Sequence, residues 1–158
     1  MWSRSAGSPT TSPGGRSARS SGNEEGRQSM SIQDMLHVMV VDDNVTSRML
    51  TVEMLQGLGL KNIQLAKDGR DGFTKLNSKP VHIVISDLYM PDVDGMKLLQ
   101  AVRASGKLSK TGFIMITGRK DAKVVDQARK LGANNVLAKP FTPAVLKGAL
   151  EAVVGKFA

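Results

Sequence analysis

The sequence predicts an α/β fold in which a five-stranded parallel sheet is doubly wound by helices. Five short apolar runs alternate with longer amphipathic stretches from Leu36 onward, and such alternation implies crossover connections between parallel strands. The runs are continuously apolar, as expected of strands that helices cover on both faces. At 158 residues, the chain has room for one domain of ordinary size.

The predicted elements follow one another in strand–helix order. The five predicted strands are LHVMVV at 36–41, NIQLA at 62–66, VHIVIS at 81–86, FIMIT at 113–117 and NVLA at 135–138. The five predicted helices span about 46–58, 71–77, 95–104, 121–131 and 143–154. The last helix has Thr142 as its N-cap and Pro143 at its first position, which is a common helix start.

Residues 1–29 differ in composition from the rest of the chain. They consist mainly of Ser, Gly, Arg, Thr and Pro and contain almost no large apolar side chain. Such a segment cannot bury enough apolar surface to offset the entropy of ordering. We therefore expect a disordered tail at 1–29 followed by a single domain at 30–158.

The composition excludes several classes of protein. The chain has no cysteine, so it has no disulfide and no thiolate chemistry, which suits the cytoplasm. No apolar run approaches the roughly 20 residues that a membrane span needs, so we expect no membrane insertion. The net charge is +8, but one Trp, one Tyr and four Phe leave few aromatic side chains to accompany it, and we expect no nucleic-acid binding.

Polar side chains stand where the predicted strands end. The first run ends in Asp42 and Asp43, the third in Asp87, the fourth in Thr117 and the fifth in Lys139. In doubly wound sheets the reactive crevice lies beyond the carboxyl ends of the strands. We therefore expect these five side chains to line one crevice.

The five residues form a chemically coherent set. Three converging carboxylates would raise one another's pKa values unless a cation neutralised them, and Mg²⁺ prefers such oxygen ligands. Lys139 adds a second positive charge and Thr117 adds a hydroxyl. Phosphoryl transfer depends on this kind of positioning and charge neutralisation, so the residues favour phosphoryl chemistry with Mg²⁺ as cofactor.

Four motifs carry a family resemblance across residues 35–157. They are the acidic pair in VMVVDDN, the aspartate in VISDLYMPDVDGM, the hydroxyl residue in FIMITG and the lysine followed by proline in NNVLAKPF. In this order they resemble the response-regulator receiver domains of two-component signalling, with a likeness to chemotaxis regulators of the CheY type. The resemblance implies a flavodoxin-like (βα)5 fold with strand order 2-1-3-4-5.

The resemblance also implies roles for the crevice residues. Asp87 would accept a phosphoryl group from a histidine kinase or a phosphotransfer domain. Asp43 and Asp87 would bind Mg²⁺ directly and Asp42 largely through water, and Tyr89 would add its backbone carbonyl.

The resemblance further implies a switch. Thr117 would move toward the new phosphate, Lys139 would pair with that phosphate, and the peptide bond between Lys139 and Pro140 would be cis. Receiver domains often carry an aromatic residue three positions before the lysine, where this chain has Val136. We therefore expect the aromatic half of the switch to be absent.

The function expected from the resemblance is that of a stand-alone regulator. The chain ends after the fifth helix, so output is expected through phosphorylation-dependent protein binding, for instance to a flagellar motor switch component. We expect no enzyme activity beyond self-phosphorylation from phosphodonors and self-dephosphorylation. A phosphate sink or a phosphorelay intermediate would have the same core, so these alternatives stay open.

An enzyme alternative rests on the residues after the first strand. The run from Asp42 to Thr46 partly resembles the D-x-D-x-T motif of haloacid-dehalogenase-type phosphatases, in which the first aspartate is phosphorylated. Asn44 replaces the second acid, which would protonate the leaving group. The phosphatase interpretation is therefore the weaker one.

Several other polar residues have structural explanations. Asp92 and Asp94 are expected to serve as turn or cap residues. His37 and His82 lie in apolar runs with no third ligand in register, so we expect strand residues rather than metal ligands.

Overall fold

The computed structural model describes residues 31–158 of the chain. The tail predicted at residues 1–29 lies outside the described residues, as does residue 30, the expected first residue of the domain. Among residues 31–158, no helix combines the length and apolar character needed to cross a bilayer.

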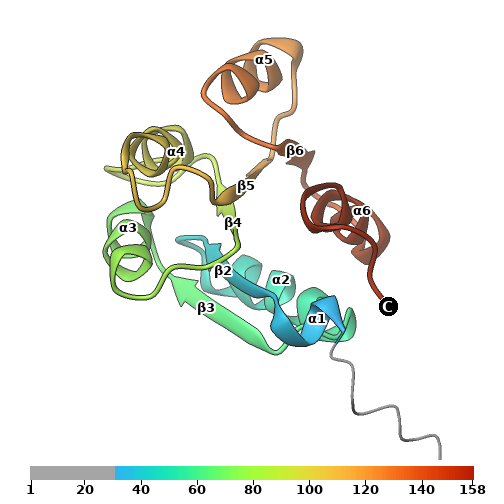
Figure 1. The fold of residues 1–158 in the computed structure, drawn as a ribbon. Coiled ribbons are helices and arrows are strands. Elements are labelled where there is room, and N and C mark those ends of the chain that lie inside the picture. The colour runs from blue at the N-terminus through green and yellow to red at the C-terminus, as the bar shows by residue number, and fades with distance from the viewer. Residues whose placement is uncertain (1–30) are drawn as a thin grey trace, which may run out of the picture. The chain divides into compact units, whose positions relative to one another are not determined.

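Five strands and six helices alternate along the described chain (Figure 1). The strands are β2 (His37–Val41), β3 (Asn62–Ala66), β4 (Ile83–Asp87), β5 (Gly112–Thr117) and β6 (Asn135–Ala138). The helices are α1 (Ile32–Met35), α2 (Val45–Gly57), α3 (Gly69–Ser78), α4 (Gly95–Ala104), α5 (Ala122–Lys130) and α6 (Pro143–Val154).

All neighbouring strands of the sheet are parallel. Their order is β3-β2-β4-β5-β6, which is 2-1-3-4-5 when the five strands are counted along the chain. This confirms the predicted doubly wound, flavodoxin-like α/β fold. The order places the carboxyl ends of β2 and β4 side by side at the middle of the sheet.

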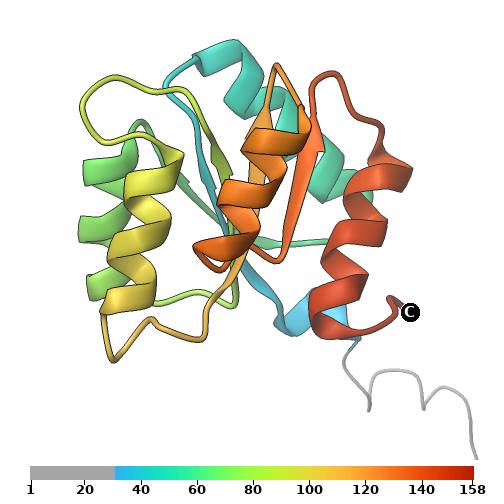
Figure 2. The same cartoon turned by 90° about the horizontal axis from the view of Figure 1, so that it is seen from above.

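Helices cover both faces of the sheet, as Figures 1 and 2 show. Because side chains alternate along a strand, Met39 and Val41 of β2 pack on the side of α3, α4 and α5. Val38 and Val40 point the other way and pack with α2 and α6. Burial of all four explains why the run is continuously apolar.

Side-chain caps define where the helices begin. In each helix from α2 to α6 the N-cap side chain accepts a hydrogen bond from the backbone N–H three residues later, the cap residues being Asn44, Asp68, Asp94, Asp121 and Thr142. The predicted roles of Thr142 as an N-cap and Asp94 as a cap residue are confirmed. α3 starts at Gly69, two residues before its predicted start, because Asp68 caps it.

Two local features differ from the prediction. β4 begins at Ile83 rather than Val81, and His82 lies just before it, where its Nδ1 accepts a hydrogen bond of 2.9 Å from the backbone N–H of His37. The short helix α1 was not predicted. It places Gln33 against Ala158, with which Gln33 makes two hydrogen bonds of 3.2 Å.

Candidate functional site

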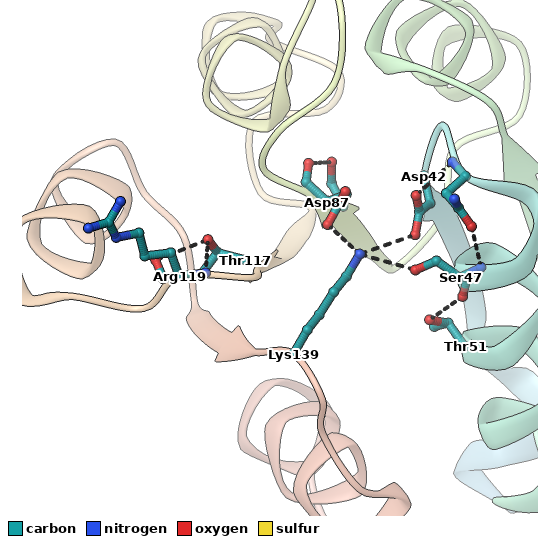
Figure 3. A network of polar contacts seen from close by, with 9 residues as sticks. Asp42, Ser47, Thr51, Asp87, Thr117, Arg119 and Lys139 are labelled. Carbon is teal, nitrogen blue, oxygen red and sulfur yellow. Dashed lines mark hydrogen bonds and ion pairs between the residues drawn. The ribbon is translucent and has the colours of Figure 1, made fainter.

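The carboxyl ends of three strands bring charged residues together. Asp42 follows β2 directly, Asp87 is the last residue of β4 and Lys139 follows β6 directly. Figure 3 shows the three side chains pointing toward one another. The strand ends therefore bring these three predicted residues together.

Three carboxylates form its acidic part. One oxygen from each of Asp42, Asp43 and Asp87 lies within 4.8 Å of the other two, in the part of the chain that the structure describes. Asp42 is buried, with 4% of its surface exposed, whereas Asp43 is exposed and Asp87 is intermediate. Solvent exposure therefore increases across the cluster from Asp42 through Asp87 to Asp43.

The start of α2 holds Asp42 in place. The backbone N–H of Asn44 donates to Asp42 Oδ1 at 2.9 Å, and the guanidinium of Arg48 donates to the Asp42 carbonyl at 2.6 Å. The other carboxylate oxygen, Oδ2, is the one nearest Lys139, at 3.7 Å. Asp42 is thus fixed by its own loop and helix.

Lys139 provides the positive charge at the centre of the site. Its Nζ lies 2.9 Å from Asp87 Oδ1 and donates to the hydroxyl of Ser47 at 3.1 Å. The backbone N–H of Lys139 donates to the Thr117 carbonyl, which ties the end of β6 to β5. The peptide bond between Lys139 and Pro140 is cis, as the resemblance implied.

The surroundings of Asp87 disfavour its charge. Burial raises the pKa of this carboxyl, and the hydrogen bond and positive charge of Lys139 oppose that rise. The negative charges of Asp42 and Asp43 raise the pKa further, so the net direction is upward. One lysine does not compensate for three carboxylates together with burial.

Thr117 is fully buried at the end of β5 and is engaged with its own loop. Its hydroxyl accepts a hydrogen bond from the backbone N–H of Arg119 and donates to the Arg119 carbonyl, both at 3.1 Å (Figure 3). To bond a group on Asp87, the hydroxyl would have to exchange one of these partners.

The first residue of α4 packs tightly against the end of β4 and against β5. A Cβ at Gly95 would lie 2.5 Å from the Asp87 carbonyl and 2.6 Å from Met115 Sδ, so only glycine fits there. Tyr89 stands outside this packing, with 59% of its surface exposed. Asp92 has a left-handed φ of 65°, which agrees with its predicted role as a turn residue.

The predicted residues Asp42, Asp43, Asp87 and Lys139 meet at this site. The sequence analysis did not identify Ser47 and Arg48, which lie in the first turn of α2. An N-cap at Asn44 would have indicated that residues 47 and 48 lie in the first helical turn, next to the end of β2. The contact of Ser47 with Lys139 spans 92 positions, and no local pattern indicates it.

The donor set fits a hard divalent cation. All three acidic side chains offer carboxylate oxygens, which are the ligands that Mg²⁺ prefers. Their oxygens are close enough for one ion to contact. Burial, and after it the charges of Asp42 and Asp43, raise the pKa of Asp87, and a bound cation would favour the charged carboxylate. The residues present therefore fit Mg²⁺.

Comparisons with known proteins agree with this geometry. The family described as "response regulator receiver domain" matches residues 38–151. The probable chemotaxis protein CheY of Rhizobium etli is 48% identical over 126 residues, which cover 80% of this chain and 98% of that protein.

Solved structures show the same fold. The chemotaxis protein CheY4 of Vibrio cholerae superposes with a TM-score of 0.71 at 30% identity, covering 76% of this chain and 99% of that chain. A chain of the complex of CheX, CheY, BeF₃ and Mg from Borrelia burgdorferi gives a TM-score of 0.70 at 25% identity, covering 75% of this chain and 89% of that chain.

Proposed function

The chain belongs to the response regulator receiver domain family, and on that premise we propose that it accepts a phosphoryl group on Asp87. Receiver domains of the CheY type are signalling proteins rather than classical enzymes. The donor in our proposal is a histidine kinase or a phosphotransfer domain. The signal then passes on through phosphorylation-dependent protein binding.

One observation carries this proposal: Asp87 is the carboxylate that Lys139 contacts at 2.9 Å while two further carboxylates lie beside it. An oxygen of Asp87 attacks the phosphorus of phosphohistidine and forms an acyl phosphate as the P–N bond breaks. The imidazole leaves with a proton. Lys139 is placed to neutralise charge on the transferred group, which is the main task of a protein in phosphoryl transfer.

We propose that Mg²⁺ completes the site. Asp43 and Asp87 would bind the ion directly, Asp42 largely through water, and Tyr89 through its backbone carbonyl. When bound, the ion supplies positive charge to the phosphoryl oxygens. The three clustered carboxylates support this assignment.

We propose the switch that the resemblance implies for Thr117, whose hydroxyl now contacts the backbone of Arg119. After phosphorylation, its hydroxyl exchanges the Arg119 carbonyl for a phosphate oxygen, and Lys139 pairs with another. The buried Val136 stands where receiver domains often carry an aromatic residue. We propose that the hydroxyl and the lysine therefore carry the switch without an aromatic partner.

The relatives support a place for the protein in chemotaxis. The Rhizobium etli protein that is 48% identical is named a probable chemotaxis protein. We propose residues 30–158 as the receiver domain, the cytoplasm as its location and a flagellar motor switch component as its output partner. Self-phosphorylation from small phosphodonors and self-dephosphorylation are its expected chemistry.

The phosphatase interpretation receives no support from the site. It requires Asp42 as the nucleophile, but Asp42 is buried and its Oδ1 accepts a hydrogen bond from the backbone N–H of Asn44. Asp87 is the more accessible of the two.

The experiment that tests the proposal is labelling with acetyl phosphate and Mg²⁺. Asp87→Asn should abolish labelling, because an amide is a poor nucleophile. Asp92→Asn is the matched control and should label like the wild type, since Asp92 is exposed in the following loop. Undiminished labelling of Asp87→Asn, or mapping of the phosphate to Asp42, would contradict the proposal.

A further inference from the structure

The Lys139 ammonium has more than carboxylate partners. An ammonium carries three N–H donors. One is directed to Asp87 Oδ1 at 2.9 Å, and another reaches Ser47 Oγ at 3.1 Å. Asp42 Oδ2, at 3.7 Å, is beyond ordinary hydrogen-bond distance. Ser47 is therefore the second close oxygen around this charge.

The backbone of Ser47 is fixed independently of Lys139. Its N–H donates to Asn44 Oδ1 at 2.8 Å, which is the cap bond of α2. Its carbonyl accepts a hydrogen bond from the Thr51 hydroxyl at 3.2 Å, one turn later. The Ser47 hydroxyl thus extends from a hydrogen-bonded helix start toward Lys139 (Figure 3).

A cavity lies beside the lysine. Its volume is about 520 Å³, and its lining includes Ser47, Lys139, Leu50, Met54 and Phe141. Because this space lies along the lysine, packing alone does not hold the ammonium beside Asp87. The position of this flexible four-carbon side chain therefore depends on its polar contacts, which are Asp87 at 2.9 Å and Ser47 at 3.1 Å.

We propose that Ser47 is a positioning residue for Lys139. Its hydroxyl keeps the ammonium on the Asp87 side of the cavity, so that the positive charge is in place when the phosphoryl group arrives. The inference rests on the proposed function, because it assigns Ser47 a part in phosphorylation of Asp87. Ser47 itself touches neither the acceptor nor, in our proposal, the phosphate.

A first measurement reads the tether directly, without phosphorylation. In metal-free protein, side-chain NMR should show the Lys139 ammonium protons exchanging with water more slowly than those of the exposed Lys130. Ser47→Ala should speed the exchange of Lys139, whereas Ser47→Thr should preserve it. The alanine variant keeps the cap bond of α2, because that bond uses the backbone N–H of residue 47.

A second measurement reads the consequence of the tether. Ser47→Ala should slow labelling of Asp87 by acetyl phosphate roughly three- to tenfold, and Ser47→Thr should restore it. Thr46→Ala removes a neighbouring exposed hydroxyl and serves as the control, with no change expected. In a Lys139→Met background, Ser47→Ala should have no further effect, because its action passes through the lysine.

The outcomes separate this inference from the proposed function. If the wild type is not labelled at Asp87, the proposed function fails, and the exchange measurement still tests the tether. If the wild type is labelled but Ser47→Ala changes neither exchange nor rate, the tether is overturned. An equal slowing by Ser47→Ala in the Lys139→Met background would show that Ser47 acts through the fold, which also overturns it.

Discussion

Partly buried charged groups lie at both ends of the sheet, but they are compensated differently. At the carboxyl ends of the strands, three carboxylates share Lys139. At the amino ends, the guanidinium of Arg103 donates to the carbonyls of Gly132, Ser109 and Thr111, at distances from 2.6 to 3.1 Å. Burial lowers the pKa of Arg103 and raises that of Asp87, so it disfavours both charges.

The difference lies in how each charge is compensated. Backbone carbonyls surround the Arg103 guanidinium. By donating to them, Arg103 links the end of α4 to the loops before β5 and β6. At the other end, compensation of the carboxylates is incomplete and leaves a role for a cation. A charge whose hydrogen bonds are all supplied by the protein contributes to stability. A cluster of like charges that the protein does not neutralise is available for binding a cation and for chemistry.

The largest expected effect lies at the amino end. Arg103→Ala should lower the free energy of unfolding by about 2–3 kcal/mol, because several carbonyls lose a charged donor. Urea denaturation measures this loss. The folded variant should still be labelled at Asp87 at the wild-type rate. A loss below about 0.5 kcal/mol would mean that water replaces the guanidinium at no cost.

The next effect concerns the carboxyl end. Asp43→Ala should weaken Mg²⁺ binding at least tenfold, or roughly 1.4 kcal/mol, because it removes a proposed direct ligand. Asp42→Ala should weaken it less, because Asp42 is expected to act largely through water. Mg²⁺ titration by calorimetry compares the two variants. Equal losses would place both carboxylates in the same relation to the ion.

The third prediction concerns how long the acyl phosphate survives, which should depend on two loop residues near the site. Tyr89 stands two residues after Asp87, the proposed acceptor, and Arg119 stands two residues after Thr117, the proposed switch residue. A phenol ring can shield the phosphate and a guanidinium can pair with its oxygens, so we expect slow self-dephosphorylation. Tyr89→Asn combined with Arg119→Glu should speed hydrolysis about tenfold, or roughly 1.4 kcal/mol of barrier. Decay of the labelled protein measures the rate, and a wild-type decay equally fast would reject the shielding.

The smallest effect is on stability and compares two aspartates of opposite character. The raised pKa of Asp87 means that its ionisation opposes folding, a cost that is absent in acid and develops as pH rises through the ordinary pKa. In metal-free protein at pH 7, Asp87→Asn should therefore raise the unfolding free energy slightly. The gain should vanish in acid, and thermal unfolding across pH measures it.

Asp71 is the control of opposite sign. Burial raises its pKa, but hydrogen bonds from the Lys67 N–H and from Lys75 outweigh burial and lower it overall. Its ionisation therefore favours folding above the ordinary pKa, and that stability is lost as pH falls through the lowered value. Asp71→Asn should destabilise slightly at neutral pH and not in acid. The same sign for both variants would contradict the comparison.

The sequence by itself determined the alternation of elements and the residues that close each strand. Apolar runs mark buried parallel strands because both faces are covered, and Asp42, Asp87 and Lys139 stand directly at or after such runs. The topology of parallel strands then requires their carboxyl ends to share one edge. For this reason, the acidic cluster can be predicted from the sequence alone.

Only the tertiary structure decided which groups touch. The hydrogen bonds from Lys139 to Ser47, from Arg103 to Gly132 and between α1 and the C-terminus join segments far apart in the chain. Such contacts depend on helix orientation and side-chain reach, neither of which has a local period in the sequence. The balance of burial and charge at Asp87 likewise follows from the packed structure, because desolvation is a property of all surrounding elements together.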